Sequence, residues 1–357
     1  MSRFYPLEVA EVRRETPDCV RIRFKVPREL ASTFRYIQGQ HLVLRRRLDG
    51  EELRRTYSIC ASVAEARLEI AVKRQPGGRM SGWLNERLRP GEVIEVMPPQ
   101  GRFFTPLDPE AKRLYVAFAA GSGITPIFSI LKTTLEVERQ SRFLLFYGNR
   151  DVRSIIFREE LEDLRDRHLG RFLLYHLLSR EQADGAFSGR ITPEKVRSWA
   201  GRLFDPAEVD AWFLCGPAPM IGVLADTLEA LGVAKERIHF EYFTPEGNRP
   251  RPAPAVAGSA PAGGEAEVLL LLDGREHRLA MQIGAETILE AALRHGIELP
   301  YSCTAGVCAT CRARLLEGEV EMAANYALEE EEVAAGHVLT CQARPRSHRI
   351  RLDFDVF

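Results

Sequence analysis

The chain has 357 residues, of which 45% are hydrophobic and 28% are charged, and its net charge is −1. This length predicts two or three domains, and the composition is typical of a globular protein that buries substantial cores. The sequence has no apolar run long enough to cross a bilayer and no concentrated basic face, so we expect neither a membrane protein nor a nucleic-acid binder.

Two further features bear on the compartment. The N-terminal stretch MSRFYPLEVAEVRRE has no apolar h-region, so it predicts a strand of the mature fold and not a signal peptide. The chain has seven cysteines, an odd number, and four of them fall in its last fifth. This distribution favours a metal site in a reducing cytoplasm over a disulfide scaffold.

The first hundred residues are rich in predicted strands. Residues 20–26, VRIRFKV, alternate apolar and basic positions as a half-buried strand does. Residues 41–59 predict a hairpin that turns at Asp49 and Gly50, and shorter runs continue the pattern. We therefore expect a small antiparallel β-barrel domain over residues 1–108.

Two motifs in this predicted barrel suit a flavin nucleotide. RRTYSIC, residues 54–60, offers an arginine for a phosphate and a tyrosine that can lie against an isoalloxazine ring. PGGRMSGWL, residues 76–84, combines glycines that allow close backbone approach with a helix predicted to start at Ser81, whose dipole favours a pyrophosphate. RRTYS alone is equally typical of a strand with solvated arginines, but the pair of motifs favours a flavin site. The candidate FAD-binding residues are Arg55, Thr56, Tyr57, Ser58, Val72, Lys73, Gly78, Arg79, Met80 and Ser81.

The sequence pattern changes over residues 109–243, where apolar runs alternate with predicted helical stretches such as FREELEDLRDRH. Buried strands that alternate with helices predict an α/β domain with a parallel, nucleotide-binding sheet. The apolar runs are residues 113–121, 142–150, 171–180 and 211–217.

A glycine-rich turn, AAGSGITPI, follows the first of these predicted strands. Gly121 and Gly123 admit a phosphate, while Thr125 with Pro126 opens the helix whose dipole faces it. The turn differs from the six-residue dinucleotide fingerprint, so by itself it is only moderate support for a nucleotide site.

The later strand ends complete this candidate site. Ser179 with Arg180, joined by Arg150, can bind the adenosine 2′-phosphate that distinguishes NADPH from NADH, although loop arginines often have no such role. Cys215, in FLCGPAPM, would ordinarily be a buried packing residue, but its place at a strand end favours contact with nicotinamide. The candidate NADP-binding residues are Gly121, Gly123, Thr125, Pro126, Asn149, Arg150, Ser179, Arg180, Cys215, Gly216, Pro217 and Met220.

A linker is predicted at residues 244–265, which contain five prolines and no apolar periodicity. Such a composition predicts a flexible, semi-extended segment that separates the body from a module over residues 266–357. From residue 267 onward the chain has 9 basic and 15 acidic residues, so an acidic module follows a basic body. This asymmetry suggests electrostatic docking between the two, or onto a third protein.

Four cysteines in the C-terminal module have the spacing of an iron–sulfur site. Cys303, Cys308 and Cys311 form C-x4-C-x2-C, and Cys341 supplies a fourth thiolate, as in plant-type two-iron ferredoxins. Small residues between them let the loop backbone close around a cluster, with N–H groups directed at the sulfurs. Structural zinc and a redox C-x-x-C pair are the weaker alternatives, because zinc usually takes two short cysteine pairs.

Several remaining features have simpler interpretations. TILEAALRHG predicts a helix with a Thr287–Glu290 capping box and a stop at Gly296. Cys19 and Cys60 are expected to be packing residues. Residues 329–332 are four glutamates, which predict a solvated helix face that could also contribute to partner docking.

The chain resembles the ferredoxin–NADP⁺ reductase superfamily with a fused C-terminal plant-type ferredoxin. The resemblance covers the whole chain except the linker, and it implies three modules: an antiparallel FAD-binding barrel, a parallel-sheet NAD(P)H-binding domain and a β-grasp ferredoxin domain. By this resemblance R-x-Y-S and the glycine/serine segment bind FAD, while GxGxTP and CGP bind the nicotinamide nucleotide. Plant reductases end on an aromatic residue that covers the flavin, and Phe243 or Tyr242 in HFEYF is the candidate here, although this chain continues past it.

Within that superfamily, residues 302–343 are similar to the reductase subunits of phenylacetyl-CoA epoxidase complexes. EGEVEM followed by NYAL and the glutamate run is more particular than the cysteine spacing. The resemblance implies electron flow from NADPH, with NADH as a second donor, through FAD and a 2Fe–2S cluster to a separate di-iron oxygenase of aerobic phenylacetate degradation. We expect a cytoplasmic oxidoreductase and nominate no residue as general acid or base.

Two alternatives remain open at this point. One is a reductase of the same architecture that serves a Rieske-type oxygenase, in the NADH- and FMN-dependent manner of phthalate-type reductases. The other is a stand-alone electron carrier or a four-cysteine zinc-binding module that only docks to an enzyme. The nucleotide-type middle domain argues against the second alternative.

Overall fold

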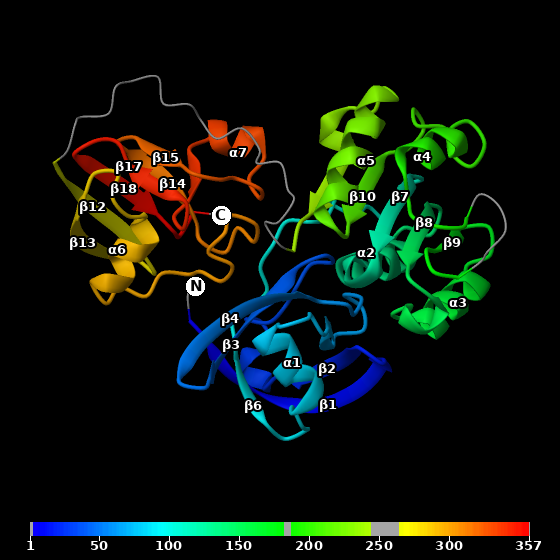
Figure 1. Ribbon diagram of the computed structural model, residues 1–357, viewed down its shortest axis with the longest axis horizontal. Coiled ribbons are helices and arrows are strands. Elements are labelled where there is room, and N and C mark those ends of the chain that lie inside the picture. The colour runs from blue at the N-terminus through cyan, green and yellow to red at the C-terminus, as the bar shows by residue number, and fades with distance from the viewer. Residues whose placement is uncertain (1–2, 182–186, 244–263, 357) are drawn as a thin grey trace. The chain divides into compact units, whose positions relative to one another are not determined.

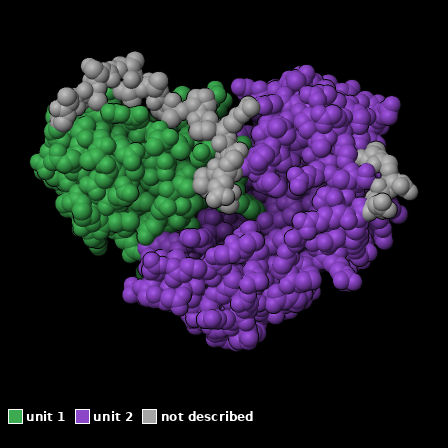
Figure 2. Space-filling view, in the orientation of Figure 1, with its two compact units in different colours: residues 1–4, 242–357 green, residues 5–241 purple. Residues whose placement is uncertain are grey.

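A computed structural model describes residues 3–181, 187–243 and 264–356. The chain forms two compact units, residues 5–241 and residues 242–357 with the first four residues (Figure 2). The predicted linker lies outside the described residues except for its last two positions. Within the described ranges, every helix is too short or too polar to cross a membrane.

The first part of the larger unit is an antiparallel β-barrel (Figure 1). Its six strands pair in the order β4-β3-β6-β1-β2-β5, and a bridge from Ile59 to Ile70 connects the end of β4 to β5 and closes the sheet. The predicted hairpin is confirmed, because Asp49 and Gly50 both have positive φ and join β3 to β4. The strands are β1 (Tyr5–Thr16), β2 (Cys19–Lys25), β3 (His41–Leu48), β4 (Glu51–Ser58), β5 (Leu68–Lys73) and β6 (Val93–Val96).

Two short helices accompany the barrel. Helix α1 (Arg79–Glu86) begins two residues earlier than predicted, with Gly78 as its N-cap. Met80 and Leu84 from this helix pack into the barrel core with strand residues such as Leu42 and Ile70. A 3₁₀ turn, η1 (Arg28–Leu30), follows β2.

The second part of the larger unit is a five-stranded parallel sheet in the order β11-β10-β7-β8-β9, as the alternating pattern predicts. The chain starts at β7 and moves outward to β9, then returns to place β10 on the other side of β7. The β7/β10 pair is therefore the point where strand order reverses, which is where open sheets bind ligands. The strands are β7 (Leu114–Ala120), β8 (Arg142–Asn149), β9 (Phe172–Leu178), β10 (Ala211–Cys215) and β11 (Ile238–Glu241).

Helices connect these strands and cover the sheet (Figure 1). Helix α2 contributes most to the core, because nearly all of its side chains are buried, and its apolar ones pack among residues such as Phe143 and Phe213. The helices are α2 (Ile124–Val137), α3 (Arg158–Arg167), α4 (Pro193–Trp199) and α5 (Ala218–Ala230), with 3₁₀ turns η2 (Gly121–Gly123), η3 (Val152–Ser154) and η4 (Lys235–Arg237).

The smaller unit is a β-grasp domain. Its mixed sheet has the order β13-β12-β18-β14-β16, in which β12 and β18 pair in parallel, and β15 pairs with β17 in a separate two-stranded sheet. The Thr287–Glu290 capping box at the start of α6 is confirmed, and Gly296 follows the helix with φ of 73°. The elements are β12 (Glu265–Leu272), β13 (Arg275–Gln282), α6 (Ile288–Arg294), β14 (Arg312–Glu317), β15 (Val320–Met322), α7 (Glu330–Ala334), β16 (His337–Leu339), β17 (Ala343–Pro345) and β18 (Arg349–Asp353).

Candidate functional site

The glycine turn after β7 lies against the end of β10. A Cβ atom on Gly123 would be 2.1 Å from the carbonyl oxygen of Cys215, so only glycine allows this approach. Gly121 has φ of 54°, the left-handed region that glycine adopts without cost. The GSG and CGP motifs, far apart in the sequence, therefore form one surface at the switch point of the sheet.

The barrel and the sheet meet at this same point through Ser58 and Glu241. The hydroxyl of Ser58, at the end of β4, donates to a Glu241 carboxylate oxygen at 3.4 Å. His41 Nδ1 is 3.6 Å from the other oxygen of Glu241. Glu241 pairs with Cys215 across the β10/β11 ladder, so the last residue of RTYS and the cysteine of CGP share one neighbouring residue.

Cys215 is a neutral thiol in this setting. Burial, with the Glu241 carboxylate as a second cause, raises the pKa of Cys215 well above its usual value. A thiol that stays protonated is a poor nucleophile. Cys215 can therefore shape and contact a ligand at the strand end, but it is unsuited to covalent catalysis.

The predicted flavin-binding residues include a half-buried tyrosine and an ordered loop. Tyr57 is partly buried against the barrel core, and burial raises the pKa of its hydroxyl. Ser81 donates to Gly78 O at 3.3 Å and accepts from Gln75 N at 3.1 Å, which fixes the loop before α1. Among the described residues, no side chain caps α1, so its first N–H groups remain available for a phosphate.

Other members of the predicted flavin set have partners within the protein. The Arg55 guanidinium donates to Arg54 O at 2.7 Å. Arg79 pairs with Glu51 and donates to Leu48 O at 2.7 Å, at the tip of the β3–β4 hairpin. The side chains of Val72 and Met80 belong to the barrel core, so only their backbone groups are available to a cofactor.

The predicted nucleotide-binding residues include a buried amide that suits a ligand. Asn149 is 7% exposed, and Tyr147 is the neighbour that its amide can contact through a hydrogen bond. The Tyr147 hydroxyl also donates to Gly121 O at 3.1 Å. The buried amide is therefore incompletely satisfied, so its place near the glycine turn favours a bound polar ligand.

The three predicted 2′-phosphate residues are brought together by the ends of β8 and β9. Ser179 N donates to Asn149 O at 3.0 Å, and Arg180 N donates to Arg150 O at 2.8 Å. Ser179 and Arg180 are exposed residues.

Of the remaining members of the nucleotide set, Thr125 and Pro126 are buried, Gly216 and Met220 are half-buried and Pro217 is exposed. Thr125 and Pro126 are buried in the first turn of α2. Gly216 admits the Met220 side chain closely, because a Cβ on that glycine would be 2.8 Å from the terminal methyl of Met220. These residues shape the turn and leave its backbone groups to a ligand.

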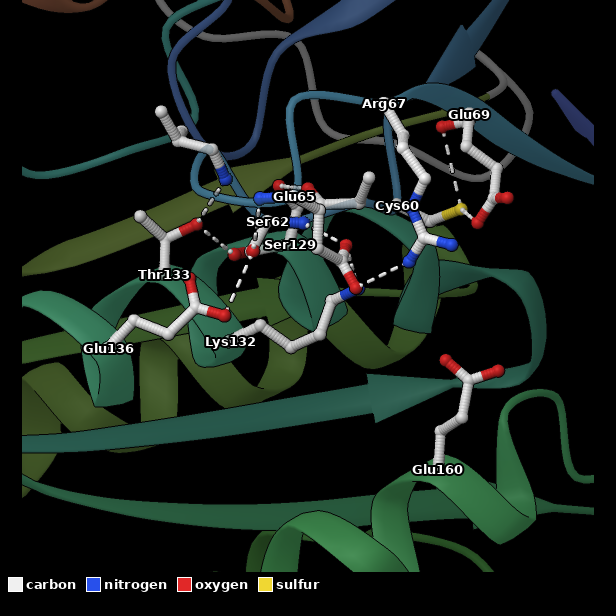
Figure 3. Close-up of polar contacts among 12 residues, drawn as sticks. Cys60, Ser62, Glu65, Arg67, Glu69, Ser129, Lys132, Thr133, Glu136 and Glu160 are labelled. Atoms are coloured by element: carbon white, nitrogen blue, oxygen red, sulfur yellow. Dashed lines mark hydrogen bonds and ion pairs between the residues drawn. The ribbon is translucent and has the colours of Figure 1, made fainter. Parts of the chain in front are cut away.

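A polar cluster holds the barrel to helix α2, which begins at the glycine turn (Figure 3). Lys132 Nζ is 2.7 Å from a Glu65 oxygen, and Ser62 donates to Glu136 at 3.0 Å. Burial acts to raise the pKa of Glu65, but the hydrogen bond and charge of Lys132 outweigh it, and the pKa is lowered. Ser129 adds a hydrogen bond to Ala61 O at 2.7 Å. These contacts fix α2 to the loop that follows the flavin motif.

The four predicted cluster ligands occur as two pairs. Cys303 lies beside Cys308, and Cys311 lies beside Cys341, so the four thiols form two neighbouring pairs. The neighbouring Cys308 thiol lowers the pKa of Cys303. No group of three or more ligand side chains surrounds a single point in the described part of the chain. Four neighbouring thiols with this spacing fit a two-iron cluster, which four cysteine thiolates would hold.

The loop around these cysteines is shaped for a cluster. Thr304, Gly306 and Ala309 have positive φ, and in this loop Ala305 N donates to Cys303 Sγ at 3.4 Å. Gln342 donates to Thr304 O at 3.0 Å and to Cys341 Sγ at 3.7 Å, so it connects the loop to the distant fourth cysteine. Backbone N–H groups directed at sulfur are the means by which proteins tune such clusters.

The predicted packing residues and the glutamate run lie outside these sites. Cys19 and Cys60 are buried, and Cys60 Sγ contacts Glu69 O at 3.5 Å. In the glutamate run, Glu332 forms an ion pair with Arg312 at 2.6 Å, while the three preceding glutamates are exposed. The solvated face is therefore confirmed for three of the four glutamates.

The two candidate flavin covers differ in exposure. Phe243 is 40% exposed, whereas Tyr242 is buried. Both residues directly follow β11, after Glu241. A role over the flavin stays a prediction for either residue.

No sequence motif points to four of the residues that contact these sites: Glu241, His41, Gln342, and Asp18, whose carboxylate is 3.0 Å from Arg150 and 3.7 Å from Lys73. Glu241 has a usable signal, because it is the last residue of a strand that ends at the ligand-binding edge of a parallel sheet. His41 and Asp18 have none, because they reach the site only through barrel closure and the contact between the barrel and the sheet.

Comparison with known proteins agrees with this three-part geometry. Residues 6–104 match the oxidoreductase FAD-binding domain, residues 118–226 the oxidoreductase NAD-binding domain, and residues 270–346 the 2Fe-2S iron-sulfur cluster binding domain. These matches confirm the predicted modules and their cofactors, FAD, a pyridine nucleotide and a 2Fe–2S cluster.

Full-length relatives are oxygenase components. The chain is 43% identical to a subunit of the 1,2-phenylacetyl-CoA epoxidase of Escherichia coli, over 100% of this chain and 99% of that protein. It is 36% identical to the ferredoxin reductase component of 3-ketosteroid-9-alpha-monooxygenase from Rhodococcus rhodochrous, over 99% and 97% of the two chains. The solved structure of phthalate dioxygenase reductase superposes with a TM-score of 0.57 at 25% identity, over 98% of both chains.

Proposed function

The chain belongs to the family of three-module oxygenase reductases that includes this subunit of the Escherichia coli epoxidase, and from this we propose that it carries electrons from NADPH to a di-iron oxygenase that epoxidises phenylacetyl-CoA. As a family member it is an oxidoreductase that uses FAD, a pyridine nucleotide and a 2Fe–2S cluster. The proposal adds the preferred nucleotide, the type of acceptor and the final substrate.

The observation that carries the proposal is the meeting of Ser58, Cys215 and Glu241 at the switch point of the sheet. Ser58 ends the predicted flavin motif, and Cys215 ends the strand that lies on the glycine turn. A flavin ring beside Ser58 and a nicotinamide beside Cys215 would therefore be neighbours, as hydride transfer requires. When bound, FAD accepts the hydride and releases its electrons singly to the cluster.

The protein's own residues contribute position and charge. The close contact between Gly123 and the carbonyl oxygen of Cys215 positions the glycine turn of the nucleotide site. The Lys132–Glu65 pair holds helix α2, which follows this turn, to the barrel. Arg150 and Arg180, which lie on adjoining loops, support the preference for NADPH, because clustered arginines can bind a 2′-phosphate. The four cysteines, in two pairs, would hold the cluster.

The acceptor is supported by similarity, since the 43% identical relative is a subunit of an epoxidase. The Rhodococcus relative, a component of a ketosteroid monooxygenase, keeps a different oxygenase as the alternative acceptor.

The test is reconstitution of turnover. The purified holoprotein is mixed with the oxygenase component of a phenylacetyl-CoA epoxidase, NADPH and phenylacetyl-CoA, and NADPH oxidation and epoxide are both measured. We expect epoxide to form in proportion to NADPH consumed. Rapid cytochrome c reduction without epoxide, together with turnover of a Rieske-type oxygenase, would show that the acceptor is wrong while the reductase chemistry stands.

A further inference from the structure

Asp18, in the turn between β1 and β2 of the barrel, contacts two cations, Arg150 of the predicted nucleotide set and Lys73 of the predicted flavin set. Its carboxylate is 3.0 Å from the guanidinium of Arg150 and 3.7 Å from Lys73 Nζ. Arg150 follows β8 of the parallel sheet, and Lys73 ends β5 of the barrel. One carboxylate therefore bridges the two halves of the larger unit at the edge where the nucleotide is expected.

The barrel fixes Asp18 in this place. Thr16 donates its hydroxyl to the other carboxylate oxygen at 2.9 Å, and Arg74 N donates to Asp18 O at 2.7 Å. The Asp18 side chain is 30% exposed and that of Arg150 is 48% exposed. The carboxylate is thus the fixed partner, and the long arginine side chain is the one that is free to reorient.

Both cations belong to the predicted phosphate-binding surface. Lys73 Nζ lies 3.9 Å from the position that a Cβ on Gly121 would occupy, at the glycine turn. Arg150 accepts a hydrogen bond at its carbonyl oxygen from Arg180 N, beside Ser179. Asp18 therefore places a negative charge where a nucleotide would bring the charge of its phosphates.

We propose that Asp18 competes with the 2′-phosphate of NADP(H) for Arg150 and so lowers the affinity of the enzyme for the phosphorylated nucleotide relative to NAD(H). The inference rests on the proposed use of Arg150 for that phosphate. Before Arg150 can pair with a 2′-phosphate it must leave Asp18, and the carboxylate then repels the incoming dianion. Such a device weakens NADP⁺ binding and favours release of the oxidised nucleotide after hydride transfer.

The test measures dissociation constants of NADP⁺ and NAD⁺ for the oxidised holoprotein by flavin difference spectra. In Asp18→Asn we expect NADP⁺ to bind about fivefold more tightly, the size of a partly exposed ion pair, and NAD⁺ to change by less than about twofold. Asparagine can still accept the Thr16 hydrogen bond, and FAD content together with the melting temperature checks the fold. Asp18→Ser, which shortens the side chain, serves as a second variant.

Two controls separate the inference from general charge effects. Glu11→Gln removes a carboxylate from its ion pair with Arg23 on the same barrel, and we expect it to leave both constants unchanged. In the Arg150→Gln background, the gain in NADP⁺ affinity from Asp18→Asn should be smaller than in the wild type, because competition for Arg150 is gone and only direct repulsion by the carboxylate remains. An equal gain in both backgrounds would contradict competition for Arg150.

The same dissociation constants can contradict the role of Asp18. Unchanged or weaker NADP⁺ binding in both Asp18 variants would overturn the inference, and so would an equal gain for NAD⁺, which would locate the competition at the pyrophosphate. If NADH proves to be the better donor while Asp18→Asn still strengthens NADP⁺ binding selectively, the proposed preference fails and the inference stands.

Discussion

Because Gly123 has no side chain, the glycine turn can lie directly against Cys215 of the CGP motif. In Gly123→Ala the new Cβ would lie 2.1 Å from the backbone of Cys215, so the glycine turn must move away from β10. We expect a loss of about 1–3 kcal/mol of stability and weaker NADP⁺ binding, with normal FAD and cluster content. Gly222→Ala, inside α5 with open space around it, is the matched control, and it should stabilise the protein by about 0.5–1 kcal/mol. A Gly123→Ala variant with wild-type NADP⁺ affinity would contradict this role of the turn.

Two half-buried histidines, His239 and His176, give the stability of the larger unit a pH dependence. Burial lowers the pKa of both His239 and His176. The His239 ring stacks on Phe213, with 5.4 Å between the ring centroids. A folded-state pKa below the unfolded value near 6.5 means that the folded protein binds fewer protons, so stability present above that pH is lost as the pH falls through it. We expect the free energy of unfolding to decrease from about pH 7.5 to about pH 5.5, and His239→Phe to make the decrease shallower. The free energy of unfolding is measured by urea titration at each pH. The same dependence of that free energy on pH in His239→Phe and in the wild type would refute the assignment.

At the scale of single residues, the sequence predicts those that share a motif and misses those that meet through the fold. Arg150, Ser179 and Arg180 are predictable together because each follows a parallel strand, and the structure brings them together. Asp18 and His41 lie in the barrel, far from those motifs in sequence, and their contacts with Arg150 and Glu241 depend on how the barrel packs on the sheet. Neither a propensity nor a spacing encodes that packing.

Helix α2 connects the nucleotide turn to the barrel through Lys132 and Glu65 (Figure 3). Lys132→Met would remove the more buried of the two cations that pair with Glu65, the other being the exposed Arg67. We expect a loss of about 1–2 kcal/mol, less than for a fully buried pair because Glu65 is partly exposed and keeps Arg67. The rate of hydride transfer should fall as well, because α2 carries the glycine turn. Stopped-flow reduction by NADPH at saturation measures that rate.

Two comparisons make the Lys132 prediction specific. The double variant Lys132→Met, Glu65→Gln should recover part of the lost stability, since the partly buried carboxylate is gone and Arg67, which loses its pair, is exposed to solvent. Arg158→Gln breaks an exposed pair with Glu162 on α3 and should cost less than about 0.5 kcal/mol. Equal losses for the Lys132 and Arg158 variants would show that the interface pair has no special role.

Elements with strong periodicity are predictable, whereas their ends are less so. The antiparallel and parallel sheets, the Asp49–Gly50 turn and the Thr287 capping box all follow from local patterns. The sequence places the start of α1 at Ser81, but the helix begins at Arg79, because Gly78 can serve as N-cap without a side-chain bond and Met80 fills the barrel core.

At the scale of the whole molecule, the cluster and the nucleotide chemistry belong to different compact units. Cys341→Ser removes one member of a thiol pair, so we expect loss of the cluster's absorbance and of cytochrome c reduction, while NADPH still reduces the flavin at the wild-type rate. Cys19→Ser, a buried thiol of the barrel, is the control and should keep the cluster. Loss of flavin reduction in Cys341→Ser would contradict the independence of the two steps.

The central claim is that electrons pass from NADPH through FAD to the cluster, and anaerobic stopped-flow reduction of the oxidised holoprotein tests it most directly. NADPH and, separately, NADH are mixed with the protein while flavin and cluster absorbance are followed. We expect flavin absorbance to bleach first and cluster absorbance second, with NADPH as the faster donor. A protein that binds no cluster after anaerobic reconstitution with iron and sulfide, or a cluster that stays oxidised after the flavin is reduced, would contradict this claim.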